Sequence, residues 1–195
     1  MKKLLILAVV ALASLTASAQ QGVGTWSVTP KVGFNVATIT DTDYGMKFGV
    51  VTGADLTYQL AEKFAITAGA FYSMQGAKEK ENGVTYTAKL DYINVPLLAN
   101  FYVIPGLAIK AGLQPGFNVG HKDKFESDGG SIEDDIEHFK SFDLSIPIGA
   151  SYEFNDFVID ARYNFGLTKL WDVKGSSSKN SVIQFTFGYK IPLGN

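Results

Sequence analysis

Apolar and polar residues alternate with a period of two along most of this chain, and this alternation limits the folds that the chain can adopt. In residues 28–36, for example, Val32, Phe34 and Val36 occupy even positions, while polar or small residues occupy the odd ones. Successive side chains of a β-strand point to opposite faces of a sheet, whereas a helix requires a period of 3.6. The pattern therefore predicts a strand with one apolar face and one polar face.

Seven further runs follow, and six of them keep one phase throughout: residues 47–60, 64–75, 107–119, 142–154, 157–167 and 183–191. The remaining run changes phase, because Leu90 and Tyr92 belong to one face and Ile93 to the other. One extra residue in a strand moves every later side chain to the opposite face. We therefore expect a β-bulge near Tyr92 and Ile93, and eight strands in all.

The connections between the runs alternate in length. Three are tight, at residues 61–63, 103–106 and 155–156. Four are longer, at residues 41–45, 78–83, 121–138 and 171–180. Even-stranded membrane barrels have short periplasmic turns and longer extracellular loops. The connections therefore predict four outer loops and place both termini in the periplasm.

The alternation alone does not decide whether the apolar face points to a protein core, as in a soluble sandwich or lipocalin-like barrel, or to lipid. The runs reach about 11 residues, the length of a tilted membrane crossing. Their polar face is rich in glycine, serine and asparagine rather than in mixed surface charges. We therefore predict an all-β fold, an eight-stranded antiparallel up-and-down transmembrane β-barrel. Aromatic residues of its apolar face would form interfacial girdles: Tyr58, Tyr72, Tyr92, Phe101, Phe154, Phe157, Tyr163 and Tyr189.

The first residues have the pattern of an export signal. Lys2 and Lys3 precede an apolar run over residues 4–12, and Ala17 and Ala19 frame an A-x-A cleavage site. The apolar run is too short to cross a bilayer as a helix, which takes about 20 apolar residues. We expect residues 1–19 to be a cleaved signal peptide and residues 20–195 to form the outer-membrane barrel.

Composition removes several classes of function. The chain has no cysteine, which excludes disulfides, thiolate metal sites, a cysteine nucleophile and a lipidated N-terminal cysteine. The formal net charge of -2 provides no basic surface for nucleic acid. We expect no cofactor.

Three segments resemble the Bacteroidetes outer-membrane β-barrel family that is often labelled PorT-like: Leu90-Asp91-Tyr92-Ile93-Asn94-Val95-Pro96-Leu97-Leu98, Ala161-Arg162-Tyr163-Asn164-Phe165-Gly166-Leu167 and Pro30-Lys31-Val32-Gly33-Phe34-Asn35. The resemblance implies a barrel over nearly the whole mature chain and, for a subset of the family, a part in a type IX-like secretion apparatus. Such barrels often end on an aromatic residue that the barrel insertion machinery recognises. Here we expect Phe185, Phe187 and Tyr189 to provide that signal, ahead of a short tail.

Charged residues fall on the polar face of several predicted strands. A closed eight-stranded barrel has an interior just wide enough for side chains, so such charges must pair. We expect a structural network of salt bridges that fills the lumen, in preference to a proton relay or an ion path. Its predicted members are Asp55, Lys110, Asp143, Glu153, Asp160, Arg162 and Lys190.

The longest predicted loop raises two further hypotheses. His121 and His138 bracket it, and with Ser131 or Ser141 they permit a hydrolase triad of the lipid A deacylase kind. The loop is also acidic, with Glu126, Asp128, Glu133, Asp134, Asp135 and Glu137. The spacing of these acids does not match an EF-hand, so we interpret them as a solvated acidic loop, with divalent cations shared with surface lipopolysaccharide as the alternative.

The favoured function is that of a non-enzymatic barrel with a structural, adhesive or envelope-interaction role through its outer loops. One alternative is an accessory component of a secretion apparatus, and the other is a lipid-modifying enzyme. Outer-membrane lipid, lipopolysaccharide, the barrel insertion machinery and an envelope or secretion protein are the expected partners. We do not expect nucleic acid to be a partner.

Overall fold

A computed structural model describes residues 21–42, 44–81, 84–127, 130–135, 139–171 and 177–193. The predicted signal peptide lies outside these residues. The described part forms one antiparallel sheet of eleven strands. In chain order these are β1 (Trp26–Ile39), β2 (Gly45–Ala61), β3 (Phe64–Glu81), β4 (Val84–Asn94), β5 (Leu97–Ile104), β6 (Leu107–Ser127), β7 (Gly130–Asp135), β8 (Phe142–Phe154), β9 (Phe157–Gly166), β10 (Asn180–Tyr189) and β11 (Ile191–Leu193).

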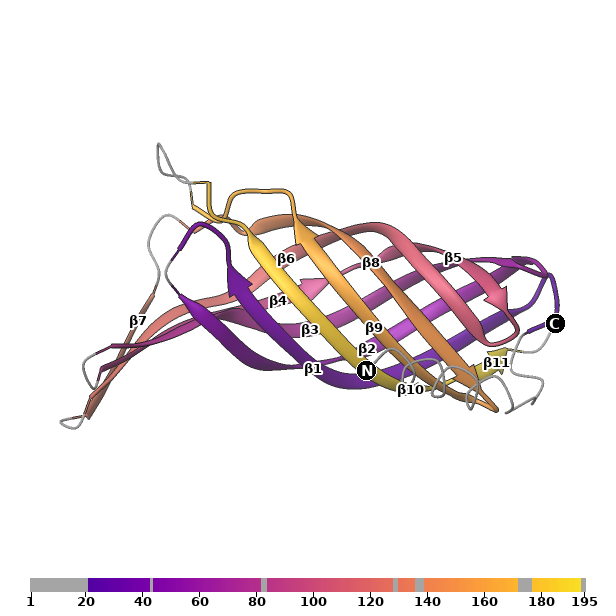
Figure 1. Ribbon diagram of the computed structural model, residues 1–195, viewed down its shortest axis with the longest axis horizontal. Coiled ribbons are helices and arrows are strands. Elements are labelled where there is room, and N and C mark those ends of the chain that lie inside the picture. Colours follow the sequence, from indigo (N-terminus) through magenta and orange to yellow (C-terminus); the bar gives the residue numbers. More distant parts are fainter. Residues whose placement is uncertain are drawn as a thin grey trace, which may run out of the picture.

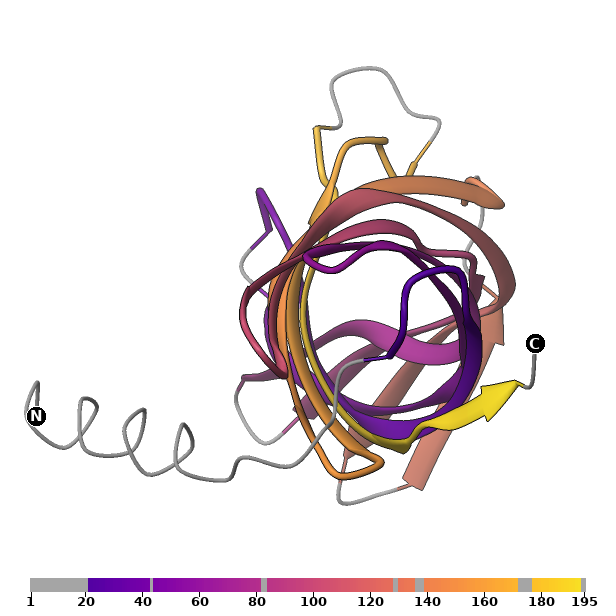
Figure 2. The same ribbon diagram turned by 90° about the vertical axis from the view of Figure 1, so that its right-hand side faces the viewer.

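The sheet closes on itself, as the end-on view of Figure 2 shows. The ring runs β1-β2-β3-β4-β6-β8-β9-β10, and β10 pairs back with β1. β5 continues the position of β4 between β3 and β6, and β11 continues that of β10 beside β1. Among the described strands, β7 pairs with β6 alone. The prediction of an eight-stranded antiparallel barrel is confirmed.

The two ends of the barrel differ. At one end, which we call the terminal end, Trp26 pairs with Leu193 and the strands are joined by tight turns at residues 62–63, 105–106 and 155–156. At the opposite end, the hairpin end, β3, β4, β6 and β7 extend beyond the ring (Figure 1). The predicted short turns are therefore present at one end, but the expected long connection at residues 78–83 is wrong, because β3 and β4 stay paired as far as Glu81 and Val84.

Apolar side chains point out of the barrel and polar ones point into it. Phe48 and Phe117 are 74% and 49% exposed on the outside, whereas Asp55 and Asp160 are buried inside. The outward residues of β3 are apolar from Phe64 to Met74, which spans roughly 33 Å along the strand and, at a tilt of about 40°, roughly 25 Å of bilayer. This arrangement is the reverse of a soluble barrel. Within the described residues, no helix is long and apolar enough to span a membrane.

The fourth strand position departs from the prediction. Pairing does shift between Asp91 and Tyr92, but the extra residue lies opposite, in β6, at Val119. The face does not change: Leu90, Tyr92 and Asn94 are all buried. The expected change of face is therefore wrong, as is the place of Tyr92 in an outer aromatic girdle, because Leu90 and Tyr92 both point into the lumen while Ile93 points outward. The strand is instead interrupted at Pro96, which has no amide hydrogen to donate.

Residues 121–138 were expected to form a loop, but much of this segment is a hairpin. β6 runs on to Ser127 and pairs with β7, so that Lys124 lies opposite Glu133. Polar residues occupy both faces of these strands, and the apolar alternation that predicted the other strands is absent. Pairing of opposite charges across the hairpin accounts for its formation.

Candidate functional site

One buried carboxylate organises the middle of the lumen. Lys31 and Lys110 donate hydrogen bonds to Asp160 Oδ2 over 3.1 and 2.8 Å, and Arg162 Nε lies 2.9 Å from Asp160 Oδ1. The cations come from β1, β6 and β9, on different sides of the ring. All four side chains are at least nine-tenths buried. The cluster therefore ties distant strands together across the lumen.

Asp55 completes this lumen ion cluster, since Lys31 Nζ lies 2.7 Å from its Oδ2. Three cations then face two carboxylates, a net charge of +1. The Arg162 guanidinium also lies over the Phe71 ring, 5.5 Å from its centroid, a cation–π contact. A Cβ on Gly69 would come within 2.5 Å of Asp55 Oδ1, so glycine leaves the space that the carboxylate occupies.

A second ionic contact lies nearer the terminal end. Lys190 pairs with Glu153, and the Tyr102 hydroxyl donates to the other Glu153 oxygen over 2.9 Å. Both charged side chains are buried. The lumen is therefore ionic from its middle to its terminal end.

Asp143 stands apart from both groups of charges. It accepts hydrogen bonds from the Thr168 hydroxyl and, over 3.0 Å, from the Asn180 amide. The same amide reaches the Tyr92 hydroxyl at 3.2 Å. Asp143 is thus held by neutral donors, and among the described residues it forms no ion pair.

The structure brings four of the seven predicted lumen residues into one cluster, Asp55, Lys110, Asp160 and Arg162. Glu153 and Lys190 form a separate pair. Sequence reasoning missed Lys31, which contacts both carboxylates of the cluster. Its odd position, opposite in phase to Val32 and Phe34, was a sufficient signal.

The lumen becomes apolar toward the hairpin end. Leu90 and Tyr92 pack there with side chains from β1, β3, β4 and the segment after β9, and partly buried aromatic residues lie against them. We call this group the apolar cap: Ile39, Ala77, Ala88, Leu90, Tyr92 and Leu170, covered by Tyr44, Phe139 and Trp171. Two buried polar residues lie in register with it, since Gln75 pairs with Leu90 and Asn180 pairs with Ile39.

The residues of the predicted hydrolase triad do not meet in the described part of the chain. His121 Nδ1 is 2.8 Å from Asn118 Oδ1, and its ring stacks on Phe139 with centroids 5.4 Å apart. Ser131 lies on β7 and Ser141 precedes β8, and among the described residues neither side chain forms a hydrogen bond with His121. His138 lies outside the described residues.

Two of the predicted acidic residues form ion pairs with lysines, Glu126 with Lys124 at 2.6 Å and Glu133 with Lys89. Asp128 and Glu137 lie outside the described residues. Among the residues that the structure describes, no three histidine or acidic side chains gather in a way that could hold a metal ion.

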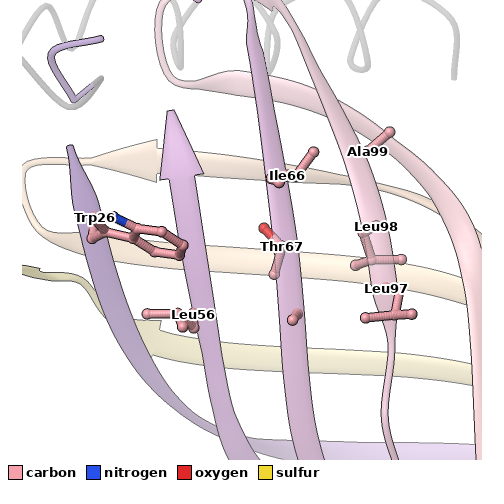
Figure 3. A pocket seen from close by; sticks show the side chains of 8 residues that line it. Trp26, Leu56, Ile66, Thr67, Leu97, Leu98 and Ala99 are labelled. Carbon is pink, nitrogen blue, oxygen red and sulfur yellow. The ribbon is translucent and has the colours of Figure 1, made fainter. Parts of the chain in front are cut away.

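An apolar groove of about 450 Å³ opens on the outer surface at the terminal end. Figure 3 shows Trp26, Leu56, Ile66 and Leu97 along it, contributed by β1, β2, β3 and β5. Thr67 is the lining residue that carries a hydroxyl group. This hydroxyl forms hydrogen bonds with the Thr57 hydroxyl and with the Asn100 amide. The groove offers apolar contact but no acid–base pair.

The sequence matches a family model over residues 17–172, and the model describes an outer membrane protein beta-barrel domain. The chain belongs to this family. The apolar outer surface of this outer membrane β-barrel is therefore its lipid-facing surface, and its polar interior is the barrel lumen.

Solved structures of small outer membrane barrels are similar to this one. Ail, the attachment invasion locus protein of Yersinia pestis, is 19% identical with a TM-score of 0.47, over 87% of this chain and 100% of that one. Neisserial surface protein A is 14% identical with a TM-score of 0.48, over 85% and 96%. OprG from Pseudomonas aeruginosa is 14% identical with a TM-score of 0.43, over 90% and 99%. Among curated proteins, none matches the chain significantly.

Proposed function

We propose that this outer membrane β-barrel is a non-enzymatic envelope protein that acts through its outer hairpins rather than through its lumen. The observation that carries the proposal is the filling of the lumen at two levels. The ion cluster around Asp160 crosses its middle, and the apolar cap around Leu90 and Tyr92 fills it toward the hairpin end. A hydrated ion would have to displace buried ion pairs and then cross an apolar layer, and both steps are costly.

Conductance across a planar bilayer tests this proposal. The reconstituted barrel should give no discrete single-channel steps at moderate voltage, because its lumen is filled. A Leu90→Ala, Tyr92→Ala double variant serves as the comparison, since it empties part of the cap. Discrete steps from the unaltered protein, at constant size from channel to channel, would overturn the proposal.

The orientation in the membrane is part of the proposal. The short turns and paired ends Trp26 and Leu193 would face the periplasm, after removal of residues 1–19, and the hairpin end would face the outside. Because the chain has no cysteine, a single cysteine can report on either end. A membrane-impermeant maleimide should label Asp134→Cys in intact cells but not Asn155→Cys. The reverse labelling pattern would show that the barrel has the opposite orientation in the membrane.

A second candidate is an accessory role in a secretion apparatus, the role that the PorT-like resemblance implies for part of that family. It is supported by apolar side chains beyond the lipid-facing band: Ile132 on β7 is 66% exposed and Phe125 opposite it is 41% exposed. Exposed apolar residues outside the bilayer are typical of protein contacts. Mild crosslinking should recover a stoichiometric envelope partner that an Ile132→Ser variant loses. Recovery of the barrel alone would favour the first candidate.

The remaining alternative, a lipid-modifying enzyme, requires a base that acts on a hydroxyl. His121 is occupied by Asn118 and Phe139 among the described residues. Replacing His121 and His138 by alanine should therefore leave the mass spectrum of lipid A unchanged. A changed lipid A mass would restore the enzyme hypothesis.

A further inference from the structure

Lysine side chains cover the outer face of three neighbouring strands at the hairpin end. On β3, β4 and β6, Lys78 lies opposite Thr87, and Thr87 lies opposite Lys124. One step toward the barrel, Lys89 lies opposite Lys122. Paired residues on adjacent strands share a face and lie about 5 Å apart. The register therefore gathers these lysines on one face, where β7 also places Glu133 opposite Lys124.

This surface borders a groove of about 320 Å³. Lys78, Lys89 and Lys124 line it on one side, and Met46 and Phe48 of β2 line it on the other. The register between β2 and β3 shifts by one residue beside the groove, between Met46 and Val51. Lysine side chains thus line one side of the groove (the cationic wall), and apolar side chains line the other (the apolar wall).

The groove lies at the edge of the lipid-facing band. Met74 is the last apolar outward residue of β3, and Lys78 follows four residues later, roughly 13 Å along the strand and, at a tilt of about 40°, roughly 10 Å along the membrane normal. Met46 and Phe48 are 66% and 74% exposed, so they continue the apolar band into the groove. The groove therefore spans the boundary between acyl chains and headgroups.

The charge of the groove is positive. Four lysines line it, including Lys47, against one carboxylate, that of Glu126. Glu126 pairs with Lys124, Glu133 of β7 pairs with Lys89, and Lys47 donates to the backbone oxygen of Gln75 over 2.6 Å. Lys78 makes no ion pair with any of the described residues. An anion placed here would find a cation that is not already neutralised.

We propose that this groove binds the phosphate groups of the outer-leaflet glycolipid, lipopolysaccharide, with Lys78, Lys89 and Lys124 on the phosphates and Met46 and Phe48 against an acyl chain. A free phosphate would use the lysines but not the apolar wall. An acidic protein segment would not need a site at the depth of the headgroups. A phosphorylated glycolipid uses both walls at once and is present at this height of the outer leaflet.

The inference rests on the proposed orientation, in which the hairpin end faces outward, but its test does not. The mature barrel in detergent micelles is titrated with lipid A that carries both phosphates and with enzymatically dephosphorylated lipid A, and complexes are counted by native mass spectrometry. The phosphorylated lipid should bind more tightly. One lysine near a lipid surface is worth about 1 kcal/mol, so Lys78→Gln should weaken binding about fivefold and Lys78→Gln with Lys124→Gln about 30-fold.

Lys63→Gln, in a turn at the terminal end, removes the same charge far from the groove and should leave binding unchanged. Heat-modifiable migration on gels verifies that each variant is folded. Phe48→Ala should weaken binding of lipid A but not of inorganic pyrophosphate. Equal binding of dephosphorylated lipid A, or an unaffected double lysine variant, would overturn the inference. Pyrophosphate binding as tight as that of lipid A would also overturn it, because the site would then be one for free anions.

Discussion

The lumen and the hairpin end of the barrel both contain lysine–carboxylate pairs, but these pairs are buried in the lumen and exposed at the hairpin end. Lys31 and Asp55 lie 2.7 Å apart with side chains only 1% and 2% exposed, whereas Lys89 and Glu133 pair with side chains 37% and 36% exposed. A buried charge that loses its partner cannot be rescued by water, while an exposed one can. Loss of an ion pair should therefore destabilise the barrel strongly in the lumen and only weakly on the hairpins.

The strongest test of this contrast is Asp160→Asn. It leaves three buried cations with Asp55 as their one remaining carboxylate, and breaking a buried ion pair typically costs about 3–5 kcal/mol. We expect a loss of that size in the free energy of unfolding, measured by urea titration in micelles. Asp134→Asn, an exposed site on β7, is the matched control and should change nothing. Equal effects at the two positions would remove the distinction between lumen and hairpins.

The apolar cap separates the two regions, and Leu90→Ala tests whether packing there matters as much as charge below it. Leu90 is fully buried, and truncating a buried leucine typically costs about 2–5 kcal/mol. We expect a loss near the middle of that range in the same urea titration. Val119→Ala, on the lipid-facing surface of β6, leaves no internal cavity and should cost less. A larger loss at Val119 than at Leu90 would contradict the placement of the cap.

Arg162→Leu should have a smaller effect than Asp160→Asn. It removes one cation from a cluster with a net charge of +1, so Asp160 keeps both lysines. We expect a loss of about 1–3 kcal/mol, the range for disturbing a buried polar group, seen as a lower unfolding temperature. Single-channel recordings should show no conductance. A change in conductance at unchanged stability would indicate a transport role instead.

Glu133→Gln should leave the unfolding midpoint within experimental error of the unaltered protein. The Glu133 side chain lies at the surface, 36% exposed, and exposed ion pairs contribute little. Unfolding monitored by tryptophan fluorescence provides the measurement. A clear loss of stability would show that the hairpin pairs are as important as those of the lumen.

The smallest expected effect is on the pKa of one carboxyl group of the hairpin, that of Glu133. The hydrogen bond from Lys89 holds the pKa of Glu133 below its ordinary value of 4.5. A lowered folded-state pKa means that the pair contributes above the unfolded pKa and is lost as the pH falls through the folded one. NMR titration of the Glu133 carboxyl should show this lowered pKa, and Lys89→Gln should raise it toward 4.5. An identical pKa in the two proteins would show that the pair does not form.

The alternation of residues such as Val32 and Phe34 was enough to predict the closed barrel and its eight positions, because lipid on one side and side chains on the other impose a strict period. It did not predict the face of Leu90 and Tyr92. Apolar residues inside the lumen look the same in the sequence as apolar residues outside it, and only packing around Ile39 and Leu170 distinguishes them.

The candidate site was predictable in part for a similar reason. Position on the polar face identified Asp160 and Arg162, but not which charges share a height in the barrel, because strand register and tilt set that. Asp143 was included in the network, although its partners are Thr168 and Asn180. The hairpin of β6 and β7 could not be read from a period of two, since water contacts both of its faces.

The seam between β1 and β10 joins the first strand of the barrel to one of its last, with Lys31 opposite Gly188. Contacts between residues so far apart in a chain form late and slowly during folding. Lys31 also contacts Asp160 of β9, so the central charges cannot all be matched until most of the chain has arrived. A half-built sheet would therefore hold unmatched charges beside acyl chains. Assembly of this barrel should accordingly be close to all-or-none, with incomplete chains left outside the bilayer for periplasmic proteases.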